Sequence, residues 1–143
     1  MVQAETVRRR LSTLLDALAD LRRYRAGVDA ERLRSDRDTQ HMVLHAMYVA
    51  AQSAIDLAFH ALSDAEAPQP ATYQQAFQRL GESGLLPAEL ARRMTGWAGL
   101  RNVLAHHYPI IDYGRVHAAL VNDLADLEAF AAAASSWLGA KEP

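Results

Sequence analysis

The chain of 143 residues has the size of one domain, and half of its residues are hydrophobic, so it can bury a core of its own. Its formal net charge of -2 excludes a uniformly basic nucleic-acid-binding protein, so any contact with nucleic acid has to depend on a local patch. The absence of cysteine excludes disulfides, thiolate catalysis and cysteine-ligated metal sites.

The first residues show no secretion signal, because they lack a charged segment followed by an apolar one. The most apolar stretch, over 41–62, contains His45, Gln52, Asp56 and His60. These polar side chains make the stretch a poor membrane span and a good buried helix. We therefore expect a soluble cytoplasmic protein that does not enter a membrane.

Apolar residues recur at helical spacing in the first part of the chain, and Gly27 is placed to end this helix. The predicted core face of the helix consists of Val7, Leu11, Leu14, Leu15, Leu18 and Leu21. A polar run over 29–38 follows, in which Ser35 is predicted to start the next helix. That second helix, over about 36–62, is apolar nearly all round, which is typical of the central helix of a bundle.

Prolines and glycines divide the rest of the chain into three further helices. Prolines before residue 72 and glycines after residue 80 bound a short helix over 72–80. Pro87 suits the first turn of a fourth helix, which continues to about residue 107, where Pro109 ends it. Asp112 is placed to cap a fifth helix that continues to about residue 138. The sequence thus predicts one all-α domain over 1–143, an antiparallel up-and-down bundle of about five helices.

The fourth predicted helix carries an arginine, Arg101, in its core-facing row. The other members of that row are Leu90, Met94, Trp97 and Leu104. Because an unpaired buried charge is very costly, Arg101 has to lie at a seam, an interface or a cleft where polar groups meet it. An ordinary ion pair with an acid such as Asp56 on the neighbouring helix would meet this need.

Two further polar side chains lie well around the same helix. At about 100° per residue, Asn102 is about 100° and His106 about 140° away from Arg101. Side chains so far apart can border one wide groove, although they do not touch along a single wall. Two copies of this helix facing each other in a symmetric dimer would supply such a groove, so we expect a homodimer.

Arg101, four residues, His106, one residue and Tyr108 resemble the R-x4-H-x-Y signature of HepT-like ribonuclease toxins, in the HEPN superfamily. Asn102, directly after the arginine, also suits the pattern of that superfamily. The length of the chain and the order of its predicted helices are similar as well. The resemblance implies a metal-independent endoribonuclease without a cofactor, in which the 2′-hydroxyl of RNA attacks the adjacent phosphate.

The resemblance also implies a role for each motif residue. His106, at a helix C-terminal end that favours its protonated form, would protonate the leaving oxygen. Arg101 would bind phosphate oxygens and stabilise the charge of the transition state. Asn102 would orient the phosphate or the imidazole. Tyr108 would receive AMP from a minimal nucleotidyltransferase antitoxin (MntA-like), and the added charge and bulk would repel RNA.

Other polar residues are weaker candidates. Asp56 is a supporting candidate that would act behind Arg101. Arg92 and Arg93 lie about two turns before the motif and are candidates for RNA phosphate contacts. Clusters such as Arg8–Arg10 are usually only solvated helix faces.

Two histidines of the second predicted helix, His41 and His45, stand four residues apart, a spacing that zinc sites use. No second pair of ligands with convincing spacing accompanies them. We therefore expect no metal site there. Together with Gln52, Asp56 and His60, these histidines are predicted to form one polar face of the helix.

Two functions of different class stay open. The first is a ribonuclease toxin that cleaves RNA and is neutralised by its nucleotidyltransferase antitoxin. The alternative is a non-catalytic HEPN binding module that supports a nucleotidyltransferase partner, in which Arg101 and His106 bind phosphate without cleaving it. A structural bundle without any site is a third interpretation, which the complete motif disfavours.

Overall fold

The computed structural model describes the backbone of residues 2–106 and 110–141, with side chains from 4 to 138 apart from that gap. The described residues form only helices and turns, and contain no strand. The helices are α1 (Val2–Gly27), α2 (Ala30–Ser35), α3 (Arg37–Asp64), α4 (Tyr73–Glu82), α5 (Ala88–His106), α6 (Tyr113–Asn122) and α7 (Leu124–Lys141). The all-α fold class is therefore confirmed.

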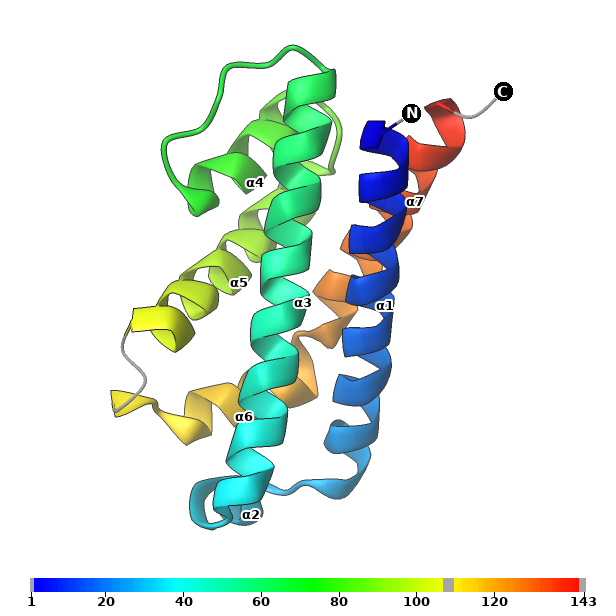
Figure 1. Cartoon of the computed structure of the whole chain (residues 1–143). Helices are drawn as coiled ribbons and strands as arrows, with labels where there is room; N and C mark the ends of the chain where they lie inside the picture. The colour runs from blue at the N-terminus through cyan, green and yellow to red at the C-terminus, as the bar shows by residue number, and fades with distance from the viewer. Residues whose placement is uncertain (1, 107–109, 142–143) are drawn as a thin grey trace.

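The long helix α3 is the centre of the molecule. It packs against α1 along most of its length, and against α4, α5 and α7 on its other sides (Figure 1). By length and composition it could cross a membrane, but 61% of its most apolar window is buried inside the molecule. Its apolar residues therefore serve the core, as their all-round distribution predicts.

Aromatic rings fill the part of the core where α4 meets α7. The rings of Phe77 and Phe130 meet edge to face, 5.6 Å between centroids, and Phe130 meets Trp137 in the same way at 5.7 Å. The indole of Trp137 donates a hydrogen bond to the carbonyl oxygen of Leu85, at 3.2 Å. These contacts fix the C-terminal helix against the α4–α5 pair.

The predicted core face of the first helix is correct except at Leu15, which is 47% exposed, whereas Leu14 is fully buried. Neighbouring residues point about 100° apart on a helix, so both leucines cannot face the core centre. The polar run after this helix is also more ordered than predicted. Asp29 caps the short helix α2 by accepting a hydrogen bond from the Arg32 amide, at 2.8 Å. Residue 36, rather than the predicted Ser35, is the N-cap of α3.

The predicted fifth helix is wrong in one respect, because it divides into α6 and α7 at Asp123. The backbone of Asp123 leaves the helical region (φ −112°, ψ 2°) while its amide still bonds to the carbonyl of Ala119, at 2.9 Å. Asn and Asp, adjacent here, are weak helix formers because their side chains compete for backbone groups. The break lets α6 pack on α2 while α7 packs along α1, so a simple five-helix bundle is not what forms (Figure 1).

Two glycines offer a matched test of the α4–α5 packing. A Cβ on Gly81 of α4 would lie 2.8 Å from the Cβ of Ala91 on α5, whereas a Cβ on the exposed Gly96 meets nothing within 4 Å. Gly81→Ala should therefore lower the Tm, because α4 and α5 have to separate. Gly96→Ala should stabilise the protein by about 0.5–1 kcal/mol, since alanine is the better helix former. Thermal unfolding measures both, and equal stability of the two variants would contradict the close approach of these helices.

Candidate functional site

Helix α5 places the motif arginine at the meeting point of three helices. The apolar members of its predicted row, Leu90, Met94, Trp97 and Leu104, are each at most 6% exposed. Arg101 lies in the same row and is half-buried, facing α3 and α4. The predicted seam position of this arginine is therefore confirmed.

The guanidinium group of Arg101 is held by neutral side chains. Its Nε donates a hydrogen bond to the side-chain oxygen of Gln52 on α3, at 2.7 Å. Its central carbon lies 4.9 Å from the ring centroid of Tyr73, the first residue of α4, and 5.6 Å from that of Tyr48 on α3. Its Nη1 donates a long hydrogen bond, 3.4 Å, to the side-chain oxygen of Asn102. No carboxylate among the described residues forms an ion pair with it.

Asp56 is connected to Arg101 through the side chain of Gln52. The amide nitrogen of Gln52 donates to one carboxylate oxygen of Asp56, at 3.0 Å. The other oxygen of Asp56 is 3.4 Å from Nε of Arg10 on α1. The four side chains thus form a chain, Arg101–Gln52–Asp56–Arg10, in which Gln52 rather than Asp56 contacts the motif arginine directly. Arg10, expected on a solvated face, thus has Asp56 as its partner.

His106 occupies the last position of α5 and is exposed. No hydrogen bond joins it to Arg101 within the described part of the chain, while Asn102, between them in sequence, is half-buried and contacts Arg101. Tyr108, the predicted site of modification, lies outside the described residues. The structure therefore brings Asn102 to Arg101 directly and Asp56 to it through Gln52, and leaves His106 at the C-terminal end of α5.

The two RNA-binding candidates are engaged with acids of the chain. Arg92 donates hydrogen bonds to Glu89 one turn earlier, and these hydrogen bonds lower the pKa of the Glu89 carboxyl. Arg93 donates from Nε to Asp126 on α7 at 2.8 Å, and its Nη1 lies 3.4 Å from Glu89. Both arginine side chains are exposed, so these pairs contribute little stability and can exchange for other anions.

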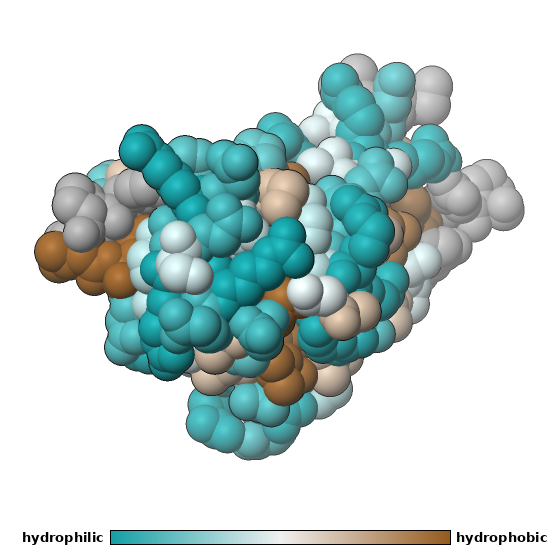
Figure 2. Space-filling model, turned by 90° about the horizontal axis from the view of Figure 1, so that it is seen from below, coloured by the Kyte–Doolittle hydropathy of each residue, from teal (hydrophilic) through white to brown (hydrophobic). Residues whose placement is uncertain are grey.

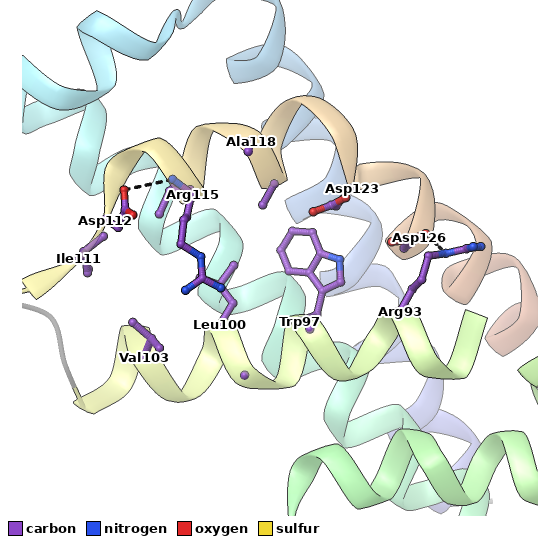
Figure 3. Close-up of a pocket in the computed structure, with 14 residues that line it drawn as sticks. Arg93, Trp97, Leu100, Val103, Ile111, Asp112, Arg115, Ala118, Asp123 and Asp126 are labelled. Carbon is purple, nitrogen blue, oxygen red and sulfur yellow. Dashed lines mark hydrogen bonds and ion pairs between the residues drawn. The ribbon is translucent and has the colours of Figure 1, made fainter. Parts of the chain in front are cut away.

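A groove with a cavity volume of about 600 Å³ lies on another face of α5, between α5 and α6. Its apolar lining includes Trp97, Leu100, Val103, Ile111 and Val116. Figure 3 shows Arg115 reaching from α6 towards α5 beside Leu100. Arg101, Asn102 and His106 are not part of this lining.

The charges around the α5–α6 groove do not favour an RNA backbone. Three acids, Asp112, Asp123 and Asp126, line it with two arginines, Arg93 and Arg115. Burial raises the pKa of the Asp123 carboxyl, and repulsion from Asp126 raises it further. Phosphate groups would meet more negative than positive charge here.

A smaller recess of about 360 Å³ lies beside Asp56 and Arg10, the two linked side chains farthest from Arg101. Arg10 and Asp56 line it together with His60. His41 and His45, the pair with zinc-like spacing, are both exposed, and the described residues contain no group of three or more His, Asp or Glu side chains arranged to hold a metal ion.

Few large apolar side chains of the described residues are exposed. The face seen from below is largely hydrophilic with separate hydrophobic spots (Figure 2). The large exposed hydrophobic residues of the described part are Leu15, Met42, Val103, Ile110 and Val121. Of these, Ile110 is the most exposed, at 76%, and it adjoins Ile111 of the α5–α6 groove.

These features define a small helical domain with an arginine–histidine motif at the end of its fifth helix. A model of the family described as Ribonuclease HepT-like matches residues 14–134. The chain therefore belongs to the HepT-like ribonuclease family, as the R-x4-H-x-Y motif predicts.

A curated relative, the tRNA nuclease HepT of Aphanizomenon flos-aquae, is 39% identical over 69 residues. The match covers 48% of this chain and 47% of the relative, so it spans about half the length of that protein.

Two solved structures show the same fold at low sequence identity. An AMPylated HEPN toxin of Shewanella oneidensis, in complex with an MNT antitoxin, has a TM-score of 0.81 at 19% identity, covering 91% of this chain and 96% of that one. The cytosolic protein of unknown function YutE from Bacillus subtilis has a TM-score of 0.82 at 13% identity, covering 96% and 91%. These similarities show that the arrangement of helices is shared.

Tyr48 and Tyr73 are neighbours of Arg101 that were not predicted from the sequence. Tyr48 precedes Gln52 by four residues and so shares its face of α3, a signal that the helical period could have supplied. Tyr73 belongs to a different helix, and only the packing of α4 against α5 and α3 brings it to the arginine.

The contact between α5 and α7 can be tested by a double-mutant cycle. Arg93→Ala and Asp126→Ala should each reduce the free energy of unfolding only slightly, because the Arg93 side chain is exposed and the pair is open to solvent on that side. Their coupling energy should be about 0.2–1 kcal/mol. Urea unfolding of the two single variants and the double variant measures it, and strictly additive effects would show that this ion pair does not form in solution.

Proposed function

We propose that this protein is an endoribonuclease that acts without a metal ion and serves as the toxin of a toxin–antitoxin pair. The observation that carries the proposal is the state of Arg101, a half-buried cation held by neutral side chains and followed five residues later by an exposed histidine. Membership of the HepT-like ribonuclease family and the similarity to the tRNA nuclease HepT of Aphanizomenon flos-aquae support it.

In the proposed reaction the ribose 2′-oxygen forms a bond to the adjacent phosphorus, and the bond from phosphorus to the 5′-oxygen breaks. Arg101 donates hydrogen bonds to the phosphate oxygens and stabilises the charge that develops on them. His106 gives its proton to the leaving 5′-oxygen, and the proton of the 2′-hydroxyl passes to water. The products are a 2′,3′-cyclic phosphate and a 5′-hydroxyl end. Asn102 orients the phosphate beside Arg101.

The proposal includes a partner and an assembly. The similar structures include a HEPN toxin described as tri-AMPylated in complex with an MNT antitoxin, and a toxin–antitoxin described with AMP-PNP. We extend this to Tyr108, which would receive AMP from a minimal nucleotidyltransferase of the MntA type. Two copies of the chain would pair with their α5 helices facing, and the protein would act in the cytoplasm, where its RNA substrate is found.

A second candidate is a binding module without catalysis. The pairing of Arg92 with Glu89 and of Arg93 with Asp126 favours it, because an RNA strand would have to displace these acids before it could use either arginine. In this function Arg101 and His106 would bind a phosphate group of a nucleotidyltransferase partner or of its nucleotide.

Replacing the motif histidine separates the two candidates. His106→Ala should reduce the cleavage rate by at least about 100-fold, as expected for loss of a general acid. His45→Ala is the matched control, since it removes an exposed histidine from α3. Both are assayed on total tRNA in EDTA, and the products are tested for cyclic phosphate ends. Full activity of the His106 variant would remove this residue from the mechanism, and no cleavage by the wild type would favour the binding module.

The modification of Tyr108 can be tested by intact-protein mass spectrometry. Incubation with ATP and a minimal nucleotidyltransferase from the same genome should add AMP to the wild type and to Tyr113→Phe, but not to Tyr108→Phe. The modified wild type should no longer cleave RNA, because the added negative charge repels phosphate. Equal modification of the Tyr108 variant would place the acceptor elsewhere.

A further inference from the structure

We propose that Gln52, Tyr48 and Tyr73 are positioning residues, which hold Arg101 as an unneutralised cation with one edge open to a phosphate group. The identity of the ligand, an RNA phosphate, rests on the proposed function. The holding arrangement itself rests on the contacts between α3, α4 and α5, and none of the three positioning residues belongs to the R-x4-H-x-Y motif.

The partners of Arg101 leave its positive charge unneutralised. Gln52 presents a neutral carbonyl oxygen to Arg101, so the hydrogen bond fixes the guanidinium without cancelling its charge. The nearest acid in this chain of side chains, Asp56, is held away by the Gln52 amide and is itself paired with Arg10. A carboxylate directly on Arg101 would compete with a phosphate for the same hydrogen-bond donors.

The same partners leave part of the guanidinium group of Arg101 without a hydrogen-bond partner among the described residues. The rings of Tyr73 and Tyr48 attract the cation without taking up its N–H groups, since the attraction of an aromatic ring is directed at the charge. Gln52 occupies Nε, and the bond from Nη1 to Asn102 is long, at 3.4 Å. Within the described residues, the hydrogen bonds of Arg101 come from Nε and Nη1 only. The two N–H groups of Nη2 and the second N–H group of Nη1 therefore form the open edge.

A second arginine–tyrosine stack in the protein differs from this one. Arg23 also lies over a tyrosine ring, that of Tyr24, at 5.3 Å, but these two are adjacent residues of α1, and Arg23 is exposed. Arg101 is instead held by two other helices, through a partner 49 positions away in sequence. Such a long-range arrangement orders the side chain before any ligand arrives, which is what a phosphate-binding arginine requires.

Moving the carboxylate tests the charge argument. The transposed variant, Gln52→Glu combined with Asp56→Asn, keeps the net charge of the protein but places the acid directly on Arg101. We expect kcat/KM for RNA cleavage to fall by about tenfold or more, the range of a lost charge-assisted hydrogen bond, with most of the change in KM. Asp56→Asn alone is the comparison, and it should have the smaller effect. A transposed variant as active as Asp56→Asn would overturn the charge argument.

Replacing a ring tests the geometry. Tyr73→Leu should raise KM several-fold, and Tyr73→Phe should restore most of the loss, because phenylalanine keeps the ring over the guanidinium. The matched control is Tyr24→Leu, which removes the arginine–tyrosine stack on α1. If Tyr73→Phe is as impaired as Tyr73→Leu, or if Tyr24→Leu has the same effect, the ring does not act through Arg101.

A third measurement does not depend on catalysis. In ¹⁵N NMR spectra of the full chain, the Nε–H of Arg101 should exchange with water more slowly than that of Arg23, and it should lose this protection in Gln52→Met. Inorganic phosphate should shift the Arg101 signals of the wild type and not those of the transposed variant. If these results hold but the wild type cleaves no RNA, the proposed function fails and the positioning stands. An Arg101 signal that exchanges as fast as that of Arg23 overturns the positioning, whatever the cleavage assay shows.

Discussion

The half-buried cation of Arg101 constrains how α3, α4 and α5 pack against one another. Arg101 lies in a row of leucine, methionine and tryptophan side chains, where a charge without partners would cost several kcal/mol. The partners come from α3 and α4, so the rotation of both helices relative to α5 has to keep Gln52, Tyr48 and Tyr73 on the arginine. A site residue and the packing of three helices therefore depend on each other.

The central helix α3 shows how a buried helix can also carry polar chemistry. Most of its surface is apolar and packs on α1, α4, α5 and α7, while Gln52, Asp56 and His60 lie half-buried on successive turns. Gln52 and Asp56 connect the arginine of α5 to Arg10 of α1 across this helix. The α5–α6 groove, on another face of α5, has more acidic than basic residues in its lining and contains none of these connected side chains.

The sequence was sufficient for features that depend on one helix at a time. The helical period placed Arg101 in the core row and predicted an all-α domain, because apolar spacing reports burial within an element. It predicted five helices where seven form in the described part of the chain. It offered Asp56 as the partner of Arg101, whereas Gln52, one turn earlier on the same face of α3, makes the contact, since the spacing within one helix does not give the position of α5 along α3. Tyr73 and the break at Asp123 were missed for a related reason, because both depend on how helices pack against each other. The motif gave the family, which the match over 14–134 shows, but not the side chains behind it.

The most direct test of the account is a crystal structure of the protein with a short RNA whose 2′-hydroxyl groups are methylated, so that it binds and is not cleaved. The account predicts a phosphate within hydrogen-bond distance of Nη1 and Nη2 of Arg101, with the bond from Nε to Gln52 retained and His106 facing the 5′-oxygen. An RNA strand seated in the α5–α6 groove on Arg115, with the surroundings of Arg101 unchanged, would contradict it.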